Sequence, residues 1–305
     1  MSKIGCLALR HLFQLGDFFD IHFQKQDISS LNVRSNIPYI NDGDRGHLLD
    51  IYGPKDADEN TPTVVNIHGG GLFAAYKEVA RSFNFRWAKR GYNVVAISYR
   101  RLPDVTLPDQ LRDVFTSLTY VREHAEELGL NMENVFLTGD SAGALLSLFA
   151  LAINNAEALQ DAFGLAPHGI NFKAANAVSI MLDTVRNDML KTLKTSILSE
   201  EDEEKPFAKY VKDPASMIAE TTLPPLFLVT SAEDLIRNDT LKYKKLLDAA
   251  GVPNRLIDEP KGKTHKLVHV FPVKYSAYEE SERISGEVNR FFREVMKDGN
   301  KSENN

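Results

Sequence analysis

Residues 134–153 read NVFLTGDSAGALLSLFALAI. The first five residues form a short apolar run, typical of a strand that is buried on both faces of a parallel sheet. The pattern Gly-x-Ser-x-Gly follows at once, and the residues after it are apolar almost all round, which is typical of a buried helix. A strand-to-helix turn holds its serine exposed, beside the N–H groups of the first helical turn. The stretch therefore predicts an α/β fold and makes Ser141 a candidate nucleophile.

Strand-like and helix-like segments alternate on both sides of this stretch. Apolar, strand-like runs occupy residues 63–67, 93–99, 225–230 and 255–258, and an Asn-Asp-Gly turn at 41–43 predicts a hairpin within residues 39–52. Helical periodicity marks residues 83–90, 109–127, 239–250 and 276–297. This rhythm predicts a mostly parallel central sheet with helices on both faces.

Two regions depart from this rhythm. Residues 155–222 contain the acidic run 200–204 and read as an insertion, which we expect to form a helical lid. Residues 1–37 carry leucines and phenylalanines at loosely helical spacing, and we expect an N-terminal lid segment there. The sequence thus predicts one domain at 38–298, with a disordered tail at 299–305.

The composition excludes several classes of protein. The chain has 305 residues, of which 43% are hydrophobic and 26% are charged, as in globular proteins. The formal net charge of −6 disfavours nucleic acid and anionic membranes as partners. A single cysteine, Cys6, excludes an internal disulfide and a cysteine-based zinc site. No apolar run reaches the length of a membrane span, and the six residues between Lys3 and Arg10 are too few for the apolar core of a signal peptide, so we expect a cytoplasmic protein.

A second motif, His68-Gly69-Gly70-Gly71, directly follows the predicted strand at 63–67. Consecutive glycines leave backbone N–H groups uncovered, so these groups can closely approach a substrate oxygen. A phosphate-binding loop is disfavoured because no Gly-Lys-Ser/Thr follows. Both motifs fall at the C-terminal ends of parallel strands, where such sheets bind ligands.

From about Tyr39 to Phe292 the chain resembles the hormone-sensitive-lipase-type carboxylesterases of the α/β-hydrolase superfamily. The resemblance rests on His68-Gly69-Gly70-Gly71, Ser98-Tyr99-Arg100 with Pro103, Pro108 and Asp113, Gly139-Asp140-Ser141-Ala142-Gly143, Asp234-Leu235 and His269-Val270-Phe271. It implies an α/β-hydrolase fold, an ion pair between Arg100 and Asp113, and an oxyanion hole made by the backbone N–H groups of Gly70, Gly71 and Ala142. Two departures leave the subfamily and substrate open: Arg101-Leu102-Pro103 stands where many members have Leu-Ala-Pro, and residues 235–239 lack a common proline.

An esterase of this kind needs an acid and then a histidine after the serine. Asp234 follows the strand-like run at 225–230, and both its position and the resemblance favour it as the acid. The neighbouring Glu233 remains an alternative. Asp239 fits better as the N-cap of the following helix.

Three histidines follow Ser141. His168 lies in the predicted lid and is expected at the surface. His265 and His269 both fall in the loop before the last helix, so their position alone admits either one. We favour His269 because its neighbours are apolar and because it matches the family's histidine with phenylalanine two residues later, whereas His265 lies among Lys263, Thr264 and Lys266.

The predicted activity is hydrolysis of a small-molecule carboxylic ester with a short- to medium-chain acyl group. Ser141, Asp234 and His269 would act through an acyl-enzyme, a chemistry that requires no metal and no organic cofactor. Two other functions stay open: an amide hydrolase such as an arylformamidase, and a non-catalytic ligand receptor on a hydrolase scaffold. The sequence also leaves open whether the chain forms a homodimer.

Overall fold

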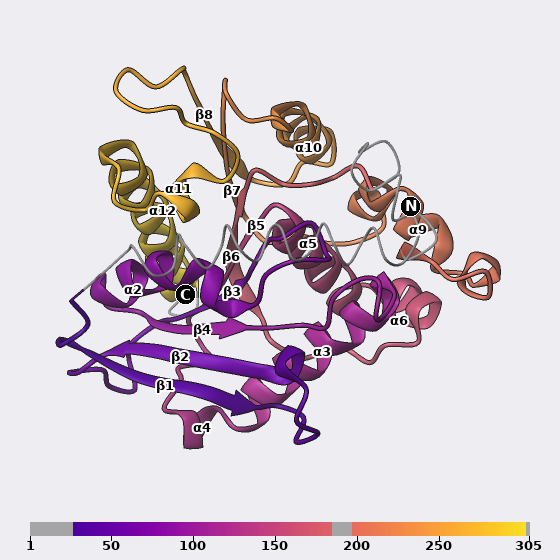
Figure 1. The fold of residues 1–305 in the computed structure, drawn as a ribbon, viewed down its shortest axis with the longest axis horizontal. Coiled ribbons are helices and arrows are strands. Elements are labelled where there is room, and N and C mark those ends of the chain that lie inside the picture. The colour runs from indigo at the N-terminus through magenta and orange to yellow at the C-terminus, as the bar shows by residue number, and fades with distance from the viewer. Residues whose placement is uncertain (1–26, 185–196, 303–305) are drawn as a thin grey trace.

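The computed structural model describes residues 27–184 and 197–302, which form one eight-stranded sheet in the order β1-β2-β4-β3-β5-β6-β7-β8 (Figure 1). The strands are β1 (Leu31–Pro38), β2 (Leu48–Pro54), β3 (Thr63–Ile67), β4 (Asn93–Ile97), β5 (Val135–Asp140), β6 (Phe172–Val178), β7 (Leu226–Ser231) and β8 (Asn254–Glu259). β2 is antiparallel to both β1 and β4, and every other neighbouring pair is parallel. The α/β-hydrolase-like sheet expected from the sequence is therefore present.

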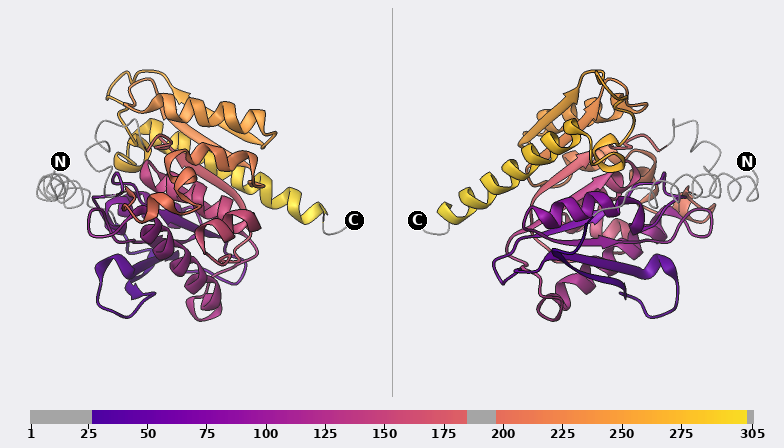
Figure 2. Two further views of the ribbon diagram at one scale, coloured as in Figure 1. Left: turned by 90° about the vertical axis from the view of Figure 1, so that its right-hand side faces the viewer. Right: turned by 60° about the vertical axis from the view of Figure 1, so that its left-hand side comes forward.

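Helices cover both faces of the sheet (Figures 1 and 2). One face carries α2 (Arg81–Lys89), α11 (Phe271–Lys274) and α12 (Glu279–Ser302), and the other carries α3 (Leu107–Glu123), α5 (Ala142–Asn154), α6 (Glu157–Phe163) and α10 (Arg237–Ala249). Shorter helices are α4 (Ala125–Leu128), α9 (Ala208–Lys212), η1 (Arg45–His47), η2 (Lys77–Ala80), η3 (Asp202–Glu204) and η4 (Pro214–Ala219). Each face of the sheet thus has its own hydrophobic core.

The central elements follow from their side chains. All five residues of β3 and all five of β4 are buried, as expected for strands with a helical layer on each side. α5 is buried along nearly its whole length, in agreement with its almost uniformly apolar sequence. Trp87 is 1% exposed and packs between the rings of Tyr92 and Phe292, which confirms that it is a core residue.

The N-terminal part of the domain differs from the prediction. Residues 31–37, expected within a lid segment, belong to β1, which pairs with β2 at the edge of the sheet. Most side chains of β1 are exposed, and its sequence lacks the regular alternation of apolar and polar residues from which a strand is predicted. Residues 1–26 of the expected lid segment lie outside the described residues.

Residues 155–222 are also not one insertion. They include α6 and the central strand β6, whose sequence FKAANAV is rich in alanine and poor in the β-branched residues that mark buried strands. The departure from the strand–helix rhythm is confined to residues 179–225, of which 185–196 lie outside the described residues. At the C-terminus, α12 extends through Ser302 into the segment expected to be a disordered tail, and residues 303–305 lie outside the described residues.

His168, expected at the surface, is fully buried. It lies in the segment that leads into the central strand β6, not in a lid. Its ring packs against Phe115 and Phe172, and burial lowers its pKa to about 4, so the imidazole is neutral at physiological pH. The predicted ion pair of Arg100 and Asp113 is confirmed at 2.7 Å.

A helix that crosses a bilayer needs roughly 20 predominantly apolar residues. Within the described ranges, no helix alone has both the length and the hydropathy to do so. α5 and α6 reach these values only when taken together, and they meet at a bend of 115°.

Candidate active site

Ser141 occupies the sharp turn between β5 and α5, with φ 52° and ψ −115°. This backbone conformation is rare for a residue with a side chain and is stored strain of roughly 1–3 kcal/mol. The flanking glycines allow it because the chain is crowded on both sides. A Cβ on Gly139 would lie 2.6 Å from the carbonyl oxygen of Gly143, and one on Gly143 would lie 2.0 Å from the carbonyl oxygen of Ile67.

The end of β6 holds this turn in place. The Ser141 N–H donates to the carbonyl oxygen of Val178 at 2.9 Å, and the Met181 N–H donates to the carbonyl oxygen of Ser141 at 3.2 Å. The turn is therefore anchored on the neighbouring strand, and the Ser141 hydroxyl points into a cavity at the C-terminal edge of the sheet.

Three candidate residues from distant parts of the chain meet at this turn. Nε2 of His269 lies 2.9 Å from Oγ of Ser141, and Nδ1 of His269 lies 2.8 Å from Oδ1 of Asp234. Asp234 follows β7 and His269 follows β8, so the C-terminal ends of parallel strands bring all three together. With the ring proton on Nδ1, His269 donates to Asp234 and accepts from the serine hydroxyl, the tautomer that a general base requires.

Asp234 is almost completely buried and is surrounded by donors. Besides His269, the Thr230 hydroxyl donates to Oδ2 at 3.0 Å and the Ile236 N–H donates to Oδ1 at 3.0 Å. Burial raises the pKa of the Asp234 carboxyl, but the hydrogen bond and charge of His269, with help from Ser179 and Ile236, outweigh burial and leave the pKa below its ordinary value. The carboxylate is thus ionised and can orient the imidazole.

The alternative candidates lie elsewhere. Glu233 makes no hydrogen bond to His269; Oε2 accepts from the backbone of Gly262 and Leu267. The exposed ring of His265 stacks on Tyr278 with ring centroids 4.3 Å apart. Asp239 is not an N-cap: α10 begins at Arg237, and Oδ2 of Asp239 accepts from the N–H groups of Leu182 and Asp183. This carboxylate ties the chain after β6 to α10, a long-range contact that the sequence pattern does not reveal.

The glycines after β3 form a backbone concavity beside Ser141. Gly70, Gly71 and Leu72 have φ values of 117°, 62° and 71°, a left-handed backbone that favours glycine, and both glycines line the cavity that contains Ser141. The N–H groups of Gly70, Gly71 and Ala142 donate to no other group in the part of the chain that the structure describes. They are therefore available to an oxygen bound in the cavity.

The side chains of Asp140 and Tyr99 hold the segment that forms this concavity. Oδ1 of Asp140 accepts from the Gly69 N–H at 3.0 Å, so the residue before the serine holds the glycine loop. The ring of His68 stacks on Tyr99, whose hydroxyl donates to the His68 carbonyl oxygen at 2.9 Å. Burial lowers the pKa of His68 to about 4, which makes it a neutral structural residue.

A cavity of about 520 Å³ opens in front of Ser141 and His269. Its walls are mainly apolar, and Leu235, which is 78% exposed, lies at its edge. The apolar lining comprises Phe73, Ala74, Ala75, Val79, Phe85, Met181, Leu235, Ile236, Val268, Val270 and Val273. The volume suits a small organic ligand, and Ser141, Gly70 and Gly71 are among the lining residues.

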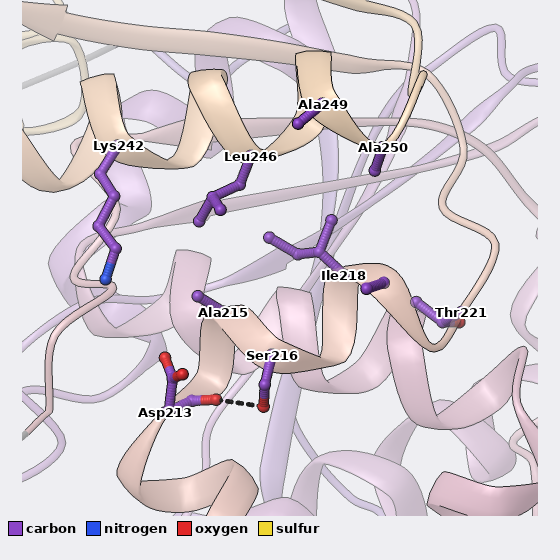
Figure 3. A pocket seen from close by; sticks show the side chains of 10 residues that line it. Asp213, Ala215, Ser216, Ile218, Thr221, Lys242, Leu246, Ala249 and Ala250 are labelled. Carbon is purple, nitrogen blue, oxygen red and sulfur yellow. Dashed lines mark hydrogen bonds between the residues drawn. The ribbon is translucent and has the colours of Figure 1, made fainter.

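A second cavity of about 580 Å³ lies between η4 and α10 (Figure 3). Its lining is largely small or apolar, and Ser216, its serine, donates to the carbonyl oxygen of Asp213 at 2.7 Å. No histidine lines it, so this cavity lacks the base that a serine nucleophile needs. In the described ranges, no group of three or more His, Cys, Asp or Glu side chains is arranged to hold a metal.

Replacing Gly71 with alanine tests the role of the glycine concavity. At φ 62° an alanine costs roughly 1–2 kcal/mol in backbone strain, at a residue that lines the Ser141 cavity. We expect kcat for an ester to fall by about 10²–10³-fold, as for the loss of an oxyanion donor.

Gly129 provides the matched control, since it has φ 64° and a Cβ added there would meet no atom within 4 Å. Gly129→Ala carries the same backbone strain far from Ser141, so it should lower the unfolding temperature similarly and leave kcat unchanged. Equal effects of the two variants on both kcat and unfolding temperature would show that Gly71 has only a structural role.

Comparisons with known proteins identify a family and several relatives. The BD-FAE family model matches residues 49–240, more than half of the chain. The chain is 26% identical to the isoprenylcysteine alpha-carbonyl methylesterase ICME of Arabidopsis thaliana over 87% of this chain and 63% of that protein. It is 28% identical to carboxylesterase NlhH of Mycobacterium tuberculosis over 69% of this chain and 68% of that protein.

The fold agrees with a solved structure over its full length. Esterase B of Lactobacillus rhamnosis, in an inhibited form, superposes with a TM-score of 0.91 and 25% identity over 99% of both chains. The chain spans less than two thirds of the length of the plant methylesterases that it matches. It belongs to the BD-FAE family and has the α/β-hydrolase fold, which confirms the predicted resemblance to hormone-sensitive-lipase-type esterases.

Proposed function

We propose that this protein is a serine hydrolase that cleaves carboxylic esters with short- to medium-chain acyl groups. The observation that carries the proposal is the hydrogen-bonded series Ser141–His269–Asp234 at 2.9 and 2.8 Å, next to uncommitted backbone N–H groups. Esterases among both the sequence relatives and the superposing structures support the same activity.

The proposed reaction has two halves. The Ser141 hydroxyl attacks the ester carbonyl carbon while Nε2 of His269 accepts its proton, and the resulting oxyanion accepts hydrogen bonds from Gly70, Gly71 and Ala142. The imidazolium then gives its proton to the leaving alcohol, and an acyl-serine remains. Water attacks this acyl-enzyme with His269 again as the base, which releases the acid and restores the serine.

The cavity supports a substrate of modest size. Its apolar walls favour burial of acyl methylene groups at about 0.8 kcal/mol for each CH₂ that leaves water. The Lactobacillus esterase has been solved in complex with a tributyrin phosphonate, and its four-carbon chains fit the size range that a cavity of about 520 Å³ admits. A cytoplasmic location remains a prediction from the sequence.

A series of p-nitrophenyl esters from acetate to dodecanoate tests this proposal. We expect kcat/KM to be highest for acyl groups of about four to eight carbons and to fall for longer chains that exceed the cavity. A p-nitroformanilide substrate run in parallel distinguishes ester from amide hydrolysis. A higher kcat/KM on the anilide would favour the arylformamidase alternative, and no turnover of either substrate would favour the receptor.

A further inference from the structure

Glu233, the residue before the proposed acid, binds backbone N–H groups, whereas its neighbour Asp234 binds the imidazole of His269. Oε2 accepts the Leu267 N–H at 2.8 Å and the Gly262 N–H at 3.1 Å. Both donors lie in the loop from β8 to α11, which carries His269 two residues after Leu267. A single carboxylate oxygen therefore joins both ends of a turn in the loop that presents the base.

Ser231, the last residue of β7, binds the carbonyl group of Leu267, whose N–H is bound by Glu233. The Ser231 hydroxyl donates to the carbonyl oxygen of Leu267 and accepts the N–H of Glu233 at 3.3 Å. Both backbone polar groups of Leu267 are thus bound by residues 231–233, and its side chain is 1% exposed. Leu267 is a fixed point from which the chain runs directly to His269.

Apart from the stacking of His265 on Tyr278, the loop between Gly262 and Leu267 has few packing contacts. Residues 263–266 are exposed, and three of the side chains between 261 and 266 are lysines, so packing contributes little there. The turn is nevertheless tight, because a Cβ on Gly262 would lie 1.8 Å from the carbonyl oxygen of His265. The N–H groups of Leu267 and Gly262 lower the pKa of the Glu233 carboxyl, so it is an anion at neutral pH and a strong acceptor.

We propose that Glu233 is a positioning residue for the reaction: its carboxylate holds the Gly262–Leu267 turn and, through Leu267, the distance of His269 from Ser141. Two adjacent acids would then position the base: Asp234 orients the imidazole of His269, and Glu233 holds the backbone that carries it. This inference rests on the proposed ester hydrolysis. Misplacement of a catalytic group by about 1 Å can cost about 10²-fold in rate.

The test compares Glu233→Ala with Glu233→Gln in the full chain, using p-nitrophenyl butyrate. Alanine removes the acceptor, and we expect kcat to fall by about 30–100-fold. KM should change by less than about twofold, because Glu233 is one polar residue in a mainly apolar cavity wall whose other residues are unchanged. The glutamine amide oxygen can accept the same two N–H groups, so Glu233→Gln should keep kcat within about threefold of the wild type.

Glu259→Ala is the matched control. Its carboxylate lies at the end of β8, where the same loop begins, and pairs with Arg283 rather than with the loop backbone. It should leave kcat unchanged, and thermal unfolding of all variants shows whether any loss of activity reflects loss of fold.

The outcomes separate the two proposals. An unchanged kcat in Glu233→Ala, or equal losses in Glu233→Ala and Glu233→Gln, would overturn the positioning role while ester hydrolysis stood. If Glu233→Ala does not fold, Ser231→Ala is the second variant, since it removes both the donor to the Leu267 carbonyl and the acceptor of the Glu233 N–H. It must lower kcat at constant KM, and an unchanged kcat there would overturn the proposal. A wild-type protein that turns over no ester would instead refute the proposed function.

Discussion

Replacing Ser141 with alanine is expected to lower kcat for p-nitrophenyl butyrate by about 10⁴–10⁶-fold, because the oxygen that forms the acyl bond is gone. The fold should persist, since alanine keeps the Cβ that the turn at φ 52° already accommodates. The measurement is steady-state hydrolysis at matched protein concentration, accompanied by thermal unfolding.

Ser147→Ala is the control for this substitution. Ser147 is a buried serine further along the same helix, where its hydroxyl donates to the Gly143 carbonyl oxygen at 2.8 Å. Its loss should leave kcat within about twofold, because helical side chains that bond back to the fourth preceding carbonyl contribute little stability. A Ser141→Ala protein with near-normal turnover would contradict the assignment of the nucleophile.

Replacing His269 with alanine is expected to cost about as much as losing Ser141, since the members of such a triad act as a unit. Without the imidazole at 2.9 Å, the Ser141 hydroxyl has no acceptor for its proton, and Asp234 is left without the group that it orients. Initial rates of p-nitrophenyl butyrate hydrolysis measure the loss.

His265→Ala tests the alternative base that position in the loop alone admits. His265 lies four residues earlier in the same loop, exposed and stacked on Tyr278, so its removal should change kcat by less than about threefold. A dead His265→Ala protein together with an active His269→Ala protein would reverse the assignment and leave ester hydrolysis in place.

The parts of the site that were predictable depend on local sequence. The turn at Ser141 lies between a strongly apolar strand and a strongly apolar helix, and the glycines at 69–71 stand directly after another such strand. Because parallel strands present their C-terminal ends at one edge, the order of motifs along the chain already placed these residues together.

The parts that were missed depend on contacts between distant segments. Three of the seven residues of β6 are alanine, a residue that is depleted in strands, and its burial comes from its position between β5 and β7. His168 was misplaced at the surface because β6 was missed. Glu233 could be weighed only as a rival acid, since its backbone partners lie 29 and 34 residues further along the chain.

The most direct test of an acyl-enzyme formed on Ser141 is peptide mass spectrometry after treatment with a fluorophosphonate, which phosphonylates an activated serine. We predict one adduct per chain, on the peptide that contains Ser141, formed in step with the loss of p-nitrophenyl butyrate hydrolysis and absent from the Ser141→Ala protein. An unmodified Ser141 in a protein that continues to hydrolyse the ester, or an inactivating adduct on another residue, would contradict the account.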